Sequence, residues 1–374
     1  MVNKFNSPVI YDEDIENVVS VIKSGWLIHG KYHNKLEAEI RDLTGAKYCM
    51  LLSSCTAALH LSLLALGTGK GDEVIVPAQS HVATAHSVEY TGAKAVIVDV
   101  DPVTGNVAPE SVLKAISKKT KVILPVHLAG VPCDMKVLKN IAKDNSLFII
   151  EDCAHSIGSV IGNKHVGTFG EGGCFSFYPT KHFTTGEGGA FVTNKKSLYE
   201  KVSKLRAFGI NTPIKMRKLP GKYDVKHLGY NYRMTDFQAA LGYGQFIRLR
   251  KRGFEVRKSI VKKYREGFKG NKNIFMVPEK HDKNSSYMFF PIYVNGKARD
   301  NLLLRLKALG IGVSVHYMTP IPFMTYYKKK YRYNTAEFKN AKSIGKRQVC
   351  LPLQVDLSDK QINGAISTIN KETK

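Results

Sequence analysis

One lysine stands between a strand-like apolar run and a glycine-rich turn, where its amine could act as a nucleophile. Lys181 lies in the segment Gly173–Gly189, which reads GCFSFYPTKHFTTGEGG. A second segment, Phe148–His155, is an apolar run that ends abruptly in two carboxylates and, three residues later, a histidine. A neutral amine attacks carbonyl carbons, and a carboxylate stabilises a positive charge beside it. The two segments together therefore indicate carbonyl chemistry.

The two adjacent carboxylates, Glu151 and Asp152, cannot both face the same site. Neighbouring side chains point to opposite faces of a strand, so we expect Asp152 to point into the site and Glu151 to serve structure. Pyridoxal phosphate (PLP) chemistry requires a lysine that bonds to the cofactor and an aspartate that keeps its pyridine nitrogen protonated. The sequence therefore predicts a PLP site with Lys181 and Asp152 as its catalytic residues.

The composition is that of a globular enzyme. Apolar residues make up 43% of the 374 residues. No apolar run reaches the roughly 18 residues of a membrane-spanning helix, and the start, MVNKFNSPVIYDEDIE, lacks the apolar core of a secretion signal. The six cysteines are scattered without C-x-x-C spacing, so we expect neither a disulfide framework nor a metal site. We predict a cytoplasmic protein that does not bind a membrane.

The net charge of +25 has two possible explanations. A solvated, lysine-rich surface would attract anionic small molecules such as nucleotides. A nucleic-acid-binding protein would need a basic stripe with interleaved aromatic residues on a recognisable module. The segment Tyr326–Tyr333, YYKKKYRY, has that composition, but no module surrounds it. We favour the solvated surface without nucleic acid, and keep a non-catalytic nucleic-acid-associated protein as the alternative of another class.

The first two thirds of the chain alternate short apolar runs with helical patterns, which is typical of an α/β fold. Continuous apolar strands separated by helices predict a mostly parallel sheet covered on both faces. The expected strands are Tyr48–Leu52, Glu73–Val76, Ala95–Val100, Val122–His127, Leu147–Ile150, Phe175–Tyr178 and Ala190–Val192. The expected helices include Thr56–Leu66, Ser80–Tyr90 and Met135–Asp144. Ligands bind at the carboxyl ends of the strands in such sheets, which is where Lys181 and Asp152 fall.

A second, smaller domain is expected after a long helix at Thr235–Arg252. We predict a large PLP-binding domain of residues 1–245, with the N-terminal segment, and a small α+β domain of residues 246–374. The elements expected in the small domain are a strand Met288–Val294, a helix Ala298–Leu309, a strand Gly312–Tyr317 and a final helix Ser358–Lys371. Lys201–Lys226, which contains glycine and proline without a clear period, is expected to be a loop.

Short motifs follow one another along nearly the whole chain. Besides the lysine segment they are GWLIHG at 25–30, SCTAAL at 54–59, PAQSH at 77–81, EDCAH at 151–155, GYNYRMTD at 229–236 and VHY at 315–317. In type and order they resemble the DegT/DnrJ/EryC1/StrS family of PLP-dependent nucleotide-sugar aminotransferases. The resemblance implies fold-type I, with a seven-stranded sheet between helices and a smaller C-terminal domain.

The resemblance also implies which residues hold PLP. They are Ser54, Cys55, Thr56, His81, Asp152, His155, Ser176, Lys181 and Asn231. The first three open a helix, whose free N–H groups suit a phosphate, and Ser176 would be a second phosphate ligand. His81 would stack on the pyridine ring, and His155 would lie near the cofactor hydroxyl. The family usually has glycine where Cys55 stands, and since glycine tolerates a positive φ, we expect this loop to differ slightly.

The resemblance further implies the substrates and the assembly. The amino group would pass from L-glutamate to a keto carbon of a nucleotide-diphosphate sugar, with a 4-keto-6-deoxyhexose of the perosamine or viosamine type as first choice. Asn231 would reach the cofactor phosphate of a neighbouring subunit, which implies an obligate homodimer with shared sites. Segments that would approach the substrate contain Trp26, His29, His316 and Tyr317, although a packed tryptophan and a strand-end histidine are equally good interpretations.

One alternative within PLP chemistry remains. A few family members carry histidine in place of the lysine and eliminate a hydroxyl instead of transferring an amine. Here Lys181 aligns and His182 follows it, so we favour the aminotransferase and keep a PLP-dependent nucleotide-sugar dehydratase as the alternative.

Overall fold

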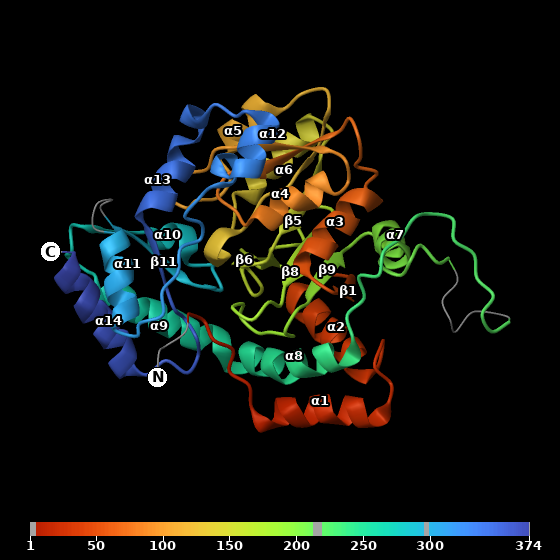
Figure 1. The fold of residues 1–374 in the computed structure, drawn as a ribbon, viewed down its shortest axis with the longest axis horizontal. Coiled ribbons are helices and arrows are strands. Elements are labelled where there is room, and N and C mark those ends of the chain that lie inside the picture. The colour runs from red at the N-terminus through yellow and green to blue at the C-terminus, as the bar shows by residue number, and fades with distance from the viewer. Residues whose placement is uncertain (1–4, 212–218, 295–298, 374) are drawn as a thin grey trace.

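The computed structural model describes residues 5–211, 219–294 and 299–373. Within them, a central seven-stranded sheet has the strand order β1-β9-β8-β5-β4-β2-β3 (Figure 1). Strand β9 runs antiparallel to both of its neighbours, and the pairs among β8, β5, β4, β2 and β3 are parallel. The mostly parallel seven-stranded sheet is therefore confirmed. Its strands are β1 (Tyr48–Leu52), β2 (Glu73–Pro77), β3 (Lys94–Val98), β4 (Thr120–Ile123), β5 (Phe148–Asp152), β8 (Gly172–Ser176) and β9 (Gly189–Thr193).

Helices cover both faces of this sheet. The helices of the large sheet and of the N-terminal segment are α1 (Asp12–Ser24), α2 (Lys31–Thr44), α3 (Cys55–Ala65), α4 (Val82–Glu89), α5 (Pro109–Ala115), α6 (Met135–Asp144), α7 (Lys196–Arg206) and α8 (Asp236–Arg248). Alternate residues of β1 enter different cores: Met50 packs with α3 and α4, whereas Leu51 packs with α2 and α8. The continuous apolar runs in the sequence follow from this burial on both faces.

The C-terminal part builds a second, antiparallel sheet of three strands in the order β10-β11-β12. Its strands are β10 (Ile274–Met276), β11 (Phe290–Val294) and β12 (Gln348–Leu351), and its helices are α9 (Phe254–Gly267), α10 (Glu279–Asp282), α11 (Arg299–Ala308), α12 (Thr325–Tyr331), α13 (Lys339–Arg347) and α14 (Asp359–Glu372). The sheet shares a core with α9, α11 and α14. Residues of α12 and α13 pack instead into the core beside α4. The boundary at 245/246 stays a prediction.

Short helical turns and a small two-stranded hairpin of β6 and β7 complete the description. They are η1 (Leu128–Gly130), β6 (Val160–Ile161), β7 (Lys164–His165), η3 (Leu249–Gly253), η4 (Ile321–Phe323) and η5 (Thr335–Phe338). The π-helical turn η3 joins α8 directly to α9, so the long helix that was expected to end at Arg252 continues to Gly267. The polypeptide therefore passes from the large sheet to the small one along nearly continuous helix.

Two expectations were wrong. No strand forms at Gly312–Tyr317, where the described backbone makes an isolated bridge between Ser314 and Cys350. The expected loop Lys201–Lys226 begins as helix, because α7 extends to Arg206 with its apolar residues buried on the sheet. Residues 212–218 of that loop, and Ala298 at the expected start of α11, lie outside the described residues.

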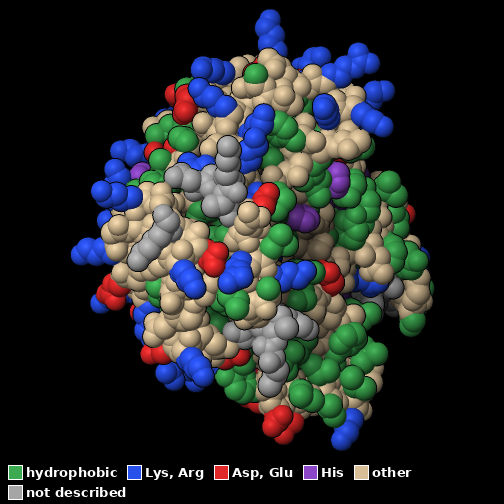
Figure 2. Space-filling view, turned by 60° about the vertical axis from the view of Figure 1, so that its left-hand side comes forward, with side chains coloured by type: hydrophobic (Ala, Val, Ile, Leu, Met, Phe, Trp, Pro, Cys, Tyr) green, Lys and Arg blue, Asp and Glu red, His purple; other side chains and the backbone are tan. Residues whose placement is uncertain are grey.

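Most tyrosines of the basic aromatic segment Tyr326–Tyr333 pack against the protein, although Tyr326 is 52% exposed. The Tyr327 side chain is fully buried and its hydroxyl lies 2.8 Å from His86 Nδ1 on α4, and the Tyr333 hydroxyl donates to the Ala95 carbonyl at 2.8 Å. Lysine and arginine side chains are scattered over the visible face rather than gathered in a stripe (Figure 2). This arrangement leaves few aromatic rings in that segment for stacking on bases. No helix among the described residues is both long and apolar enough to cross a bilayer.

Candidate active site

Lys181 lies on the loop that follows β8, close to the carboxyl end of the sheet. Its amide donates to the Tyr178 carbonyl at 2.9 Å, which turns the chain back after the strand. Its Nζ lies 3.8 Å from Sδ of the fully buried Met288. Burial lowers the pKa of the Lys181 amine to about 8, and the nearby Cys55 and Asp152 only partly oppose that effect. A much larger fraction of this amine than of an ordinary lysine amine is therefore neutral, and nucleophilic, near neutral pH.

Asp152 ends β5 and is held by three groups. Its Oδ2 accepts from the Thr84 hydroxyl at 2.8 Å, and its Oδ1 accepts from the Ala154 amide at 3.0 Å and faces the Cys55 thiol at 4.0 Å. Burial raises the pKa of this carboxyl, while the hydrogen bonds from Ala154 and Thr84 and the charge of Lys181 oppose the rise. A buried carboxylate of this kind is stabilised by a further cation that faces it.

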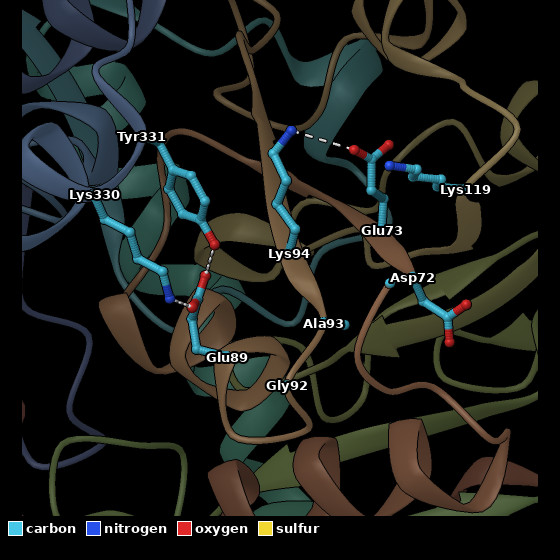
Figure 3. Close-up of a pocket in the computed structure, with 10 residues that line it drawn as sticks. Asp72, Glu73, Glu89, Gly92, Ala93, Lys94, Lys119, Lys330 and Tyr331 are labelled. Carbon is cyan, nitrogen blue, oxygen red and sulfur yellow. Dashed lines mark hydrogen bonds and ion pairs between the residues drawn. The ribbon is translucent and has the colours of Figure 1, made fainter.

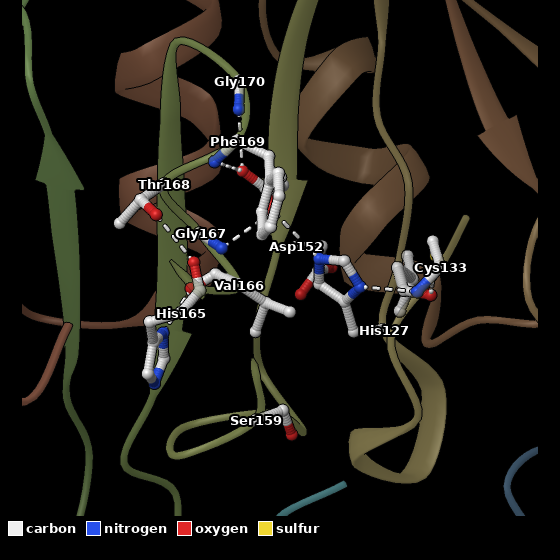
Figure 4. A network of polar contacts seen from close by, with 12 residues as sticks. His127, Cys133, Asp152, Ser159, His165, Val166, Gly167, Thr168, Phe169 and Gly170 are labelled. Carbon is white, nitrogen blue, oxygen red and sulfur yellow. Dashed lines mark hydrogen bonds and ion pairs between the residues drawn. The ribbon is translucent and has the colours of Figure 1, made fainter. Parts of the chain in front are cut away.

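Glu151 faces the opposite side of the strand, as its alternation with Asp152 predicts. Its carboxylate accepts from the amides of Gly167 at 2.7 Å, Phe169 at 2.7 Å and Gly170 at 2.9 Å (Figure 4). It also accepts from His127 Nε2 at 3.1 Å. Despite complete burial, these hydrogen bonds lower the pKa of Glu151 below its ordinary value. Glu151 thus fixes the chain between β7 and β8 behind the site.

Both nitrogens of the His127 ring take part in hydrogen bonds within the protein. The Cys133 amide donates to His127 Nδ1 at 3.0 Å, so the ring proton resides on Nε2 and is donated to Glu151. His127, Glu151 and Cys153 lie close enough together to hold a metal ion. The hydrogen bonds nevertheless engage both histidine nitrogens and the carboxylate, so this cluster is explained as a buried polar network.

Four predicted aromatic side chains lie close together near Lys181 and Asp152. His81 begins α4, with its Nδ1 accepting from the Ala83 amide at 3.2 Å and its ring 5.6 Å from that of Tyr317. The Tyr317 hydroxyl lies 3.4 Å from His155 Nε2. His155 is buried with a pKa well below the ordinary value, through burial and the neighbouring Lys181. His316 stacks on Phe289 with ring centroids 4.5 Å apart. The predicted residues His81, His155, His316 and Tyr317 therefore come together.

The start of α3 forms a corner whose geometry suits an anion. Ser54 is the N-cap, and its Oγ accepts from the Ala57 amide at 3.0 Å. Ser176 at the end of β8 pairs with Gly189 of β9. A Cβ on Gly189 would stand 2.4 Å from the Cys55 amide nitrogen, so only glycine lets β9 approach the helix start this closely. Free amides of the first helical turn at Ser54, Cys55 and Thr56 thus lie beside the Ser176 strand end.

The expected difference of this loop from the family pattern at Cys55 stays a prediction. Cys55 is the first residue of α3 and is absent from the residues with positive φ in the described chain. Its backbone is therefore ordinary for a helix start, and the position does not require glycine.

The residues present fit PLP. The helix start with Ser176 would hold its phosphate, Asp152 would face its pyridine nitrogen, and Lys181 would bond to its carbonyl carbon. The observation that supports the fit is the buried Asp152 carboxylate, which has neutral donors on one side and would gain a protonated ring nitrogen as its missing cation. The individual roles of these residues stay predictions.

Three predicted residues belong to a different group. Asn231 is exposed and its Oδ1 accepts from Arg233 Nε at 2.9 Å. Trp26 is 65% exposed. His29 lies near Arg206 and Arg233, and burial lowers its pKa to about 4. None of the described contacts of these three side chains involves Lys181.

Sequence reasoning did not single out three residues that shape the site. Thr84 contacts Asp152, and Met288 contacts Lys181. Gln79 Nε2 donates to the Tyr317 carbonyl at 2.9 Å. Thr84 had a usable signal, because it follows His81 by three residues and therefore lies about one helical turn further along the same face. Met288 had none, since it comes close to Lys181 only through packing of the small sheet.

Comparison with known proteins agrees with this geometry. The model of the DegT/DnrJ/EryC1/StrS aminotransferase family matches residues 8–370. GDP-perosamine synthase of Escherichia coli O157:H7 is 33% identical over 97% of this chain and 96% of its own. Spore coat polysaccharide biosynthesis protein SpsC of Bacillus subtilis is 33% identical over 99% of this chain and 97% of its own.

A solved structure is also similar over the whole chain. It is the putative sugar aminotransferase Spr1654 from Streptococcus pneumoniae in its PMP form, 31% identical, with a TM-score of 0.93 and 99% of each chain covered. The same protein has been solved in a PLP form. The fold-type I architecture and the PLP cofactor predicted from the sequence are confirmed by these similarities.

Proposed function

The chain belongs to the DegT/DnrJ/EryC1/StrS aminotransferase family and is a PLP-dependent sugar aminotransferase, and on that premise we propose that it aminates a keto-deoxy sugar carried on a nucleoside diphosphate. The amino group comes from L-glutamate, which leaves as 2-oxoglutarate. One observation carries the proposal. The Lys181 amine, whose pKa is lowered to about 8, lies near the buried Asp152 carboxylate at the carboxyl edge of the sheet.

PLP supplies an electron-accepting ring and carries the amino group between glutamate and the sugar. Lys181 Nζ, being free to gain and lose a proton near pH 8, moves the proton on and off the substrate carbon. Asp152 would hold a proton on the ring nitrogen of bound PLP, and Thr84 and Ala154 keep its two carboxylate oxygens in place. His155, neutral because it is buried, offers a hydrogen bond without adding charge. The rings of His81 and Tyr317 exclude water from the reacting face.

We propose a 4-keto-6-deoxyhexose as the sugar, with a product of the perosamine or viosamine type, for surface polysaccharide or glycan synthesis in the cytoplasm. The similarity to a protein named GDP-perosamine synthase supports this choice. The six buried free thiols are compatible with a reducing compartment. The net charge of +25 favours capture of a nucleoside diphosphate.

We further propose that the active unit is a homodimer with shared sites. The described residues between α7 and α8 extend away from the body of the molecule (Figure 1) and carry apolar side chains in water, with Leu228 82% and Tyr223 53% exposed. Asn231 follows on the same segment, with Arg233 engaging its Oδ1. Its amide N–H groups are thus left to donate, as the phosphate of a second subunit's cofactor would require.

The test is amino transfer from ¹⁵N-glutamate. The PLP-loaded protein would be mixed with labelled glutamate and GDP-, UDP- or dTDP-linked 4-keto-6-deoxyhexoses in turn, and the sugar products analysed by mass spectrometry. We expect ¹⁵N in one aminated sugar together with 2-oxoglutarate. Label that never leaves glutamate with any keto sugar would refute the proposal, and a sugar that loses a hydroxyl without gaining ¹⁵N would identify the dehydratase.

A further inference from the structure

A cavity lies beside the Lys181 loop, between the N-terminal segment, the end of α8, the start of α9 and residues 354–362. Its volume is about 580 Å³. Cationic side chains dominate its lining: Lys181, Arg248, Lys251, Arg252, Arg257 and Lys263. Asp359 is the one acidic residue of the lining that the described part of the chain provides. The cavity therefore carries a large excess of positive charge.

Some of these cations are neutralised within the protein, and others are not. Arg248 pairs with Asp14, and Lys263 pairs with Asp359. Lys251, Arg252 and Arg257 have no ion pair within the described residues. A cation without an anion nearby is costly where water is excluded. Of these three lining cations without an ion pair, Lys251 and Arg252 are exposed and Arg257 is buried.

Arg257 is the buried member of that group. It is 3% exposed, and its Nη1 donates to the Tyr287 and Met288 carbonyls at 3.2 and 3.3 Å. Its Nε is buried without a hydrogen-bond partner in the described structure. Burial lowers the pKa of this guanidinium to about 10, with no carboxylate to oppose the effect. A fully buried guanidinium with an unused N–H donor indicates a missing acceptor.

A cavity elsewhere in the described structure provides a contrast. It has a volume of about 390 Å³ and is lined by both signs of charge at the opposite edge of the sheet (Figure 3). There Lys94 pairs with Glu73 at 3.2 Å, and Lys330 pairs with Glu89. That cavity therefore has both signs of charge in its lining, whereas cations dominate the lining of the cavity beside Lys181.

We propose that the cavity beside Lys181 binds a phosphate-bearing small molecule, with the phosphate between Arg252 and Arg257. Guanidinium groups bind phosphate oxygens with pairs of N–H donors, and the unused Arg257 Nε provides one. The rest of the ligand would contact the apolar side of the lining, formed by Val256, Ile260 and Leu357. The ligand is free phosphate or a nucleotide, since both present the same group. This site is separate from the proposed cofactor phosphate corner at α3.

Binding of phosphate to the PLP-loaded protein tests the proposal, because the cofactor then fills its own phosphate corner. Inorganic phosphate and UDP would be titrated at constant ionic strength by calorimetry. The diagnostic variant is Arg252→Gln, whose exposed side chain is not needed for folding. The matched control is Lys258→Gln, which removes an exposed cation of the same helix that pairs with Glu255 outside the cavity.

We expect Arg252→Gln to weaken phosphate binding by about tenfold, as the loss of a charged hydrogen bond does, and Lys258→Gln to leave it unchanged. Tighter binding of UDP than of phosphate that is also weakened by Arg252→Gln would identify a nucleotide ligand of this cavity, and equal binding of the two that is weakened by Arg252→Gln would identify free phosphate. Equal affinity in the Arg252→Gln and Lys258→Gln proteins, or no binding to the wild type, would overturn the proposal. Arg257→Met is a second variant for use only where circular dichroism shows the native fold.

Discussion

The Thr84 hydroxyl donates to Oδ2 of Asp152 at 2.8 Å, so a residue of α4 fixes the carboxylate that ends β5. This bond lowers the pKa of Asp152 against the effect of burial. Thr84 is 1% exposed and also hydrogen-bonds Ser80, so its orientation is fixed before any ligand arrives.

Replacing Thr84 tests this positioning role. We expect Thr84→Val to raise the pKa of Asp152, because the carboxylate loses a donor and its protonated form is favoured. The acidic limb of the pH profile of kcat should move to higher pH, and kcat should fall by about tenfold. Thr84→Ser, which keeps the hydroxyl, should restore both values. A valine variant with an unchanged acidic limb would remove Thr84 from this role.

The carboxylate itself should be essential for rate rather than for cofactor retention. In Asp152→Asn the amide can still hydrogen-bond the pyridine nitrogen but cannot favour its protonation. We expect PLP to remain bound while turnover falls by about 10²- to 10³-fold. Absorbance after gel filtration measures retention, and product formation measures turnover. Near-normal turnover would show that Asp152 does not act on the ring.

The amine of Lys181 should titrate far below an ordinary lysine. Its pKa is lowered from 10.5 to about 8 by burial, so the neutral form should appear as the pH rises through that value. Trace acetylation of PLP-free protein at a series of pH values, with mass spectrometry of the Lys181 peptide, reports the neutral fraction. A midpoint near 8 is expected. A midpoint above 10 would mean that the side chain is solvated.

Subunit mixing tests the shared site. Lys181→Ala should abolish turnover, by at least about 10⁴-fold, and Asn231→Ala should weaken PLP retention. A heterodimer of the two variants would contain one site with both groups and one site with neither, if Asn231 serves its partner. Activity should therefore return on mixing. No recovery despite subunit exchange proven by native mass spectrometry would place Asn231 in its own subunit's site or outside both.

Glu151 should matter for stability. Its pKa is lowered below 4.5 in the folded protein, so its contribution to stability is present above the unfolded pKa and is lost as the pH falls through the folded pKa. In Glu151→Gln an amide N–H₂ group would face backbone donors, and we expect a loss of about 3 kcal/mol in the free energy of unfolding at pH 7. Urea unfolding measures it, with the exposed Glu16→Gln as control. A loss below about 0.5 kcal/mol would contradict the network.

Local patterns predicted much of the sheet and of the catalytic pair. Side chains alternate between the two faces of a strand, which correctly placed Asp152 and Glu151 of β5 on opposite faces. Strand β1 was predicted at its observed bounds, Tyr48–Leu52, because burial on both faces gives it a continuous apolar run. The same reasoning failed at Gly312–Tyr317, which alternates like a strand. There the His316 amide donates to Gln348 Oε1 at 2.8 Å, so a side chain takes the place of a neighbouring strand.

Contacts between distant segments could not be predicted from one sequence. Met288 meets Lys181 only because α9 carries the small sheet back to the lysine loop. The unpaired guanidinium of Arg257 looks in the sequence like any arginine on an amphipathic helix. Its significance lies in burial and in the absence of a described carboxylate partner, and both are tertiary properties.

Helix α4 connects the molecular surface to the catalytic carboxylate. Its last turns are fastened to the C-terminal part, where Tyr327 meets His86 at 2.8 Å and Tyr331 donates to Glu89. Its first turn holds Asp152 through Thr84. Hydrogen bonds at both ends of this two-turn helix therefore join the surface helix α12 to the buried carboxylate that ends β5.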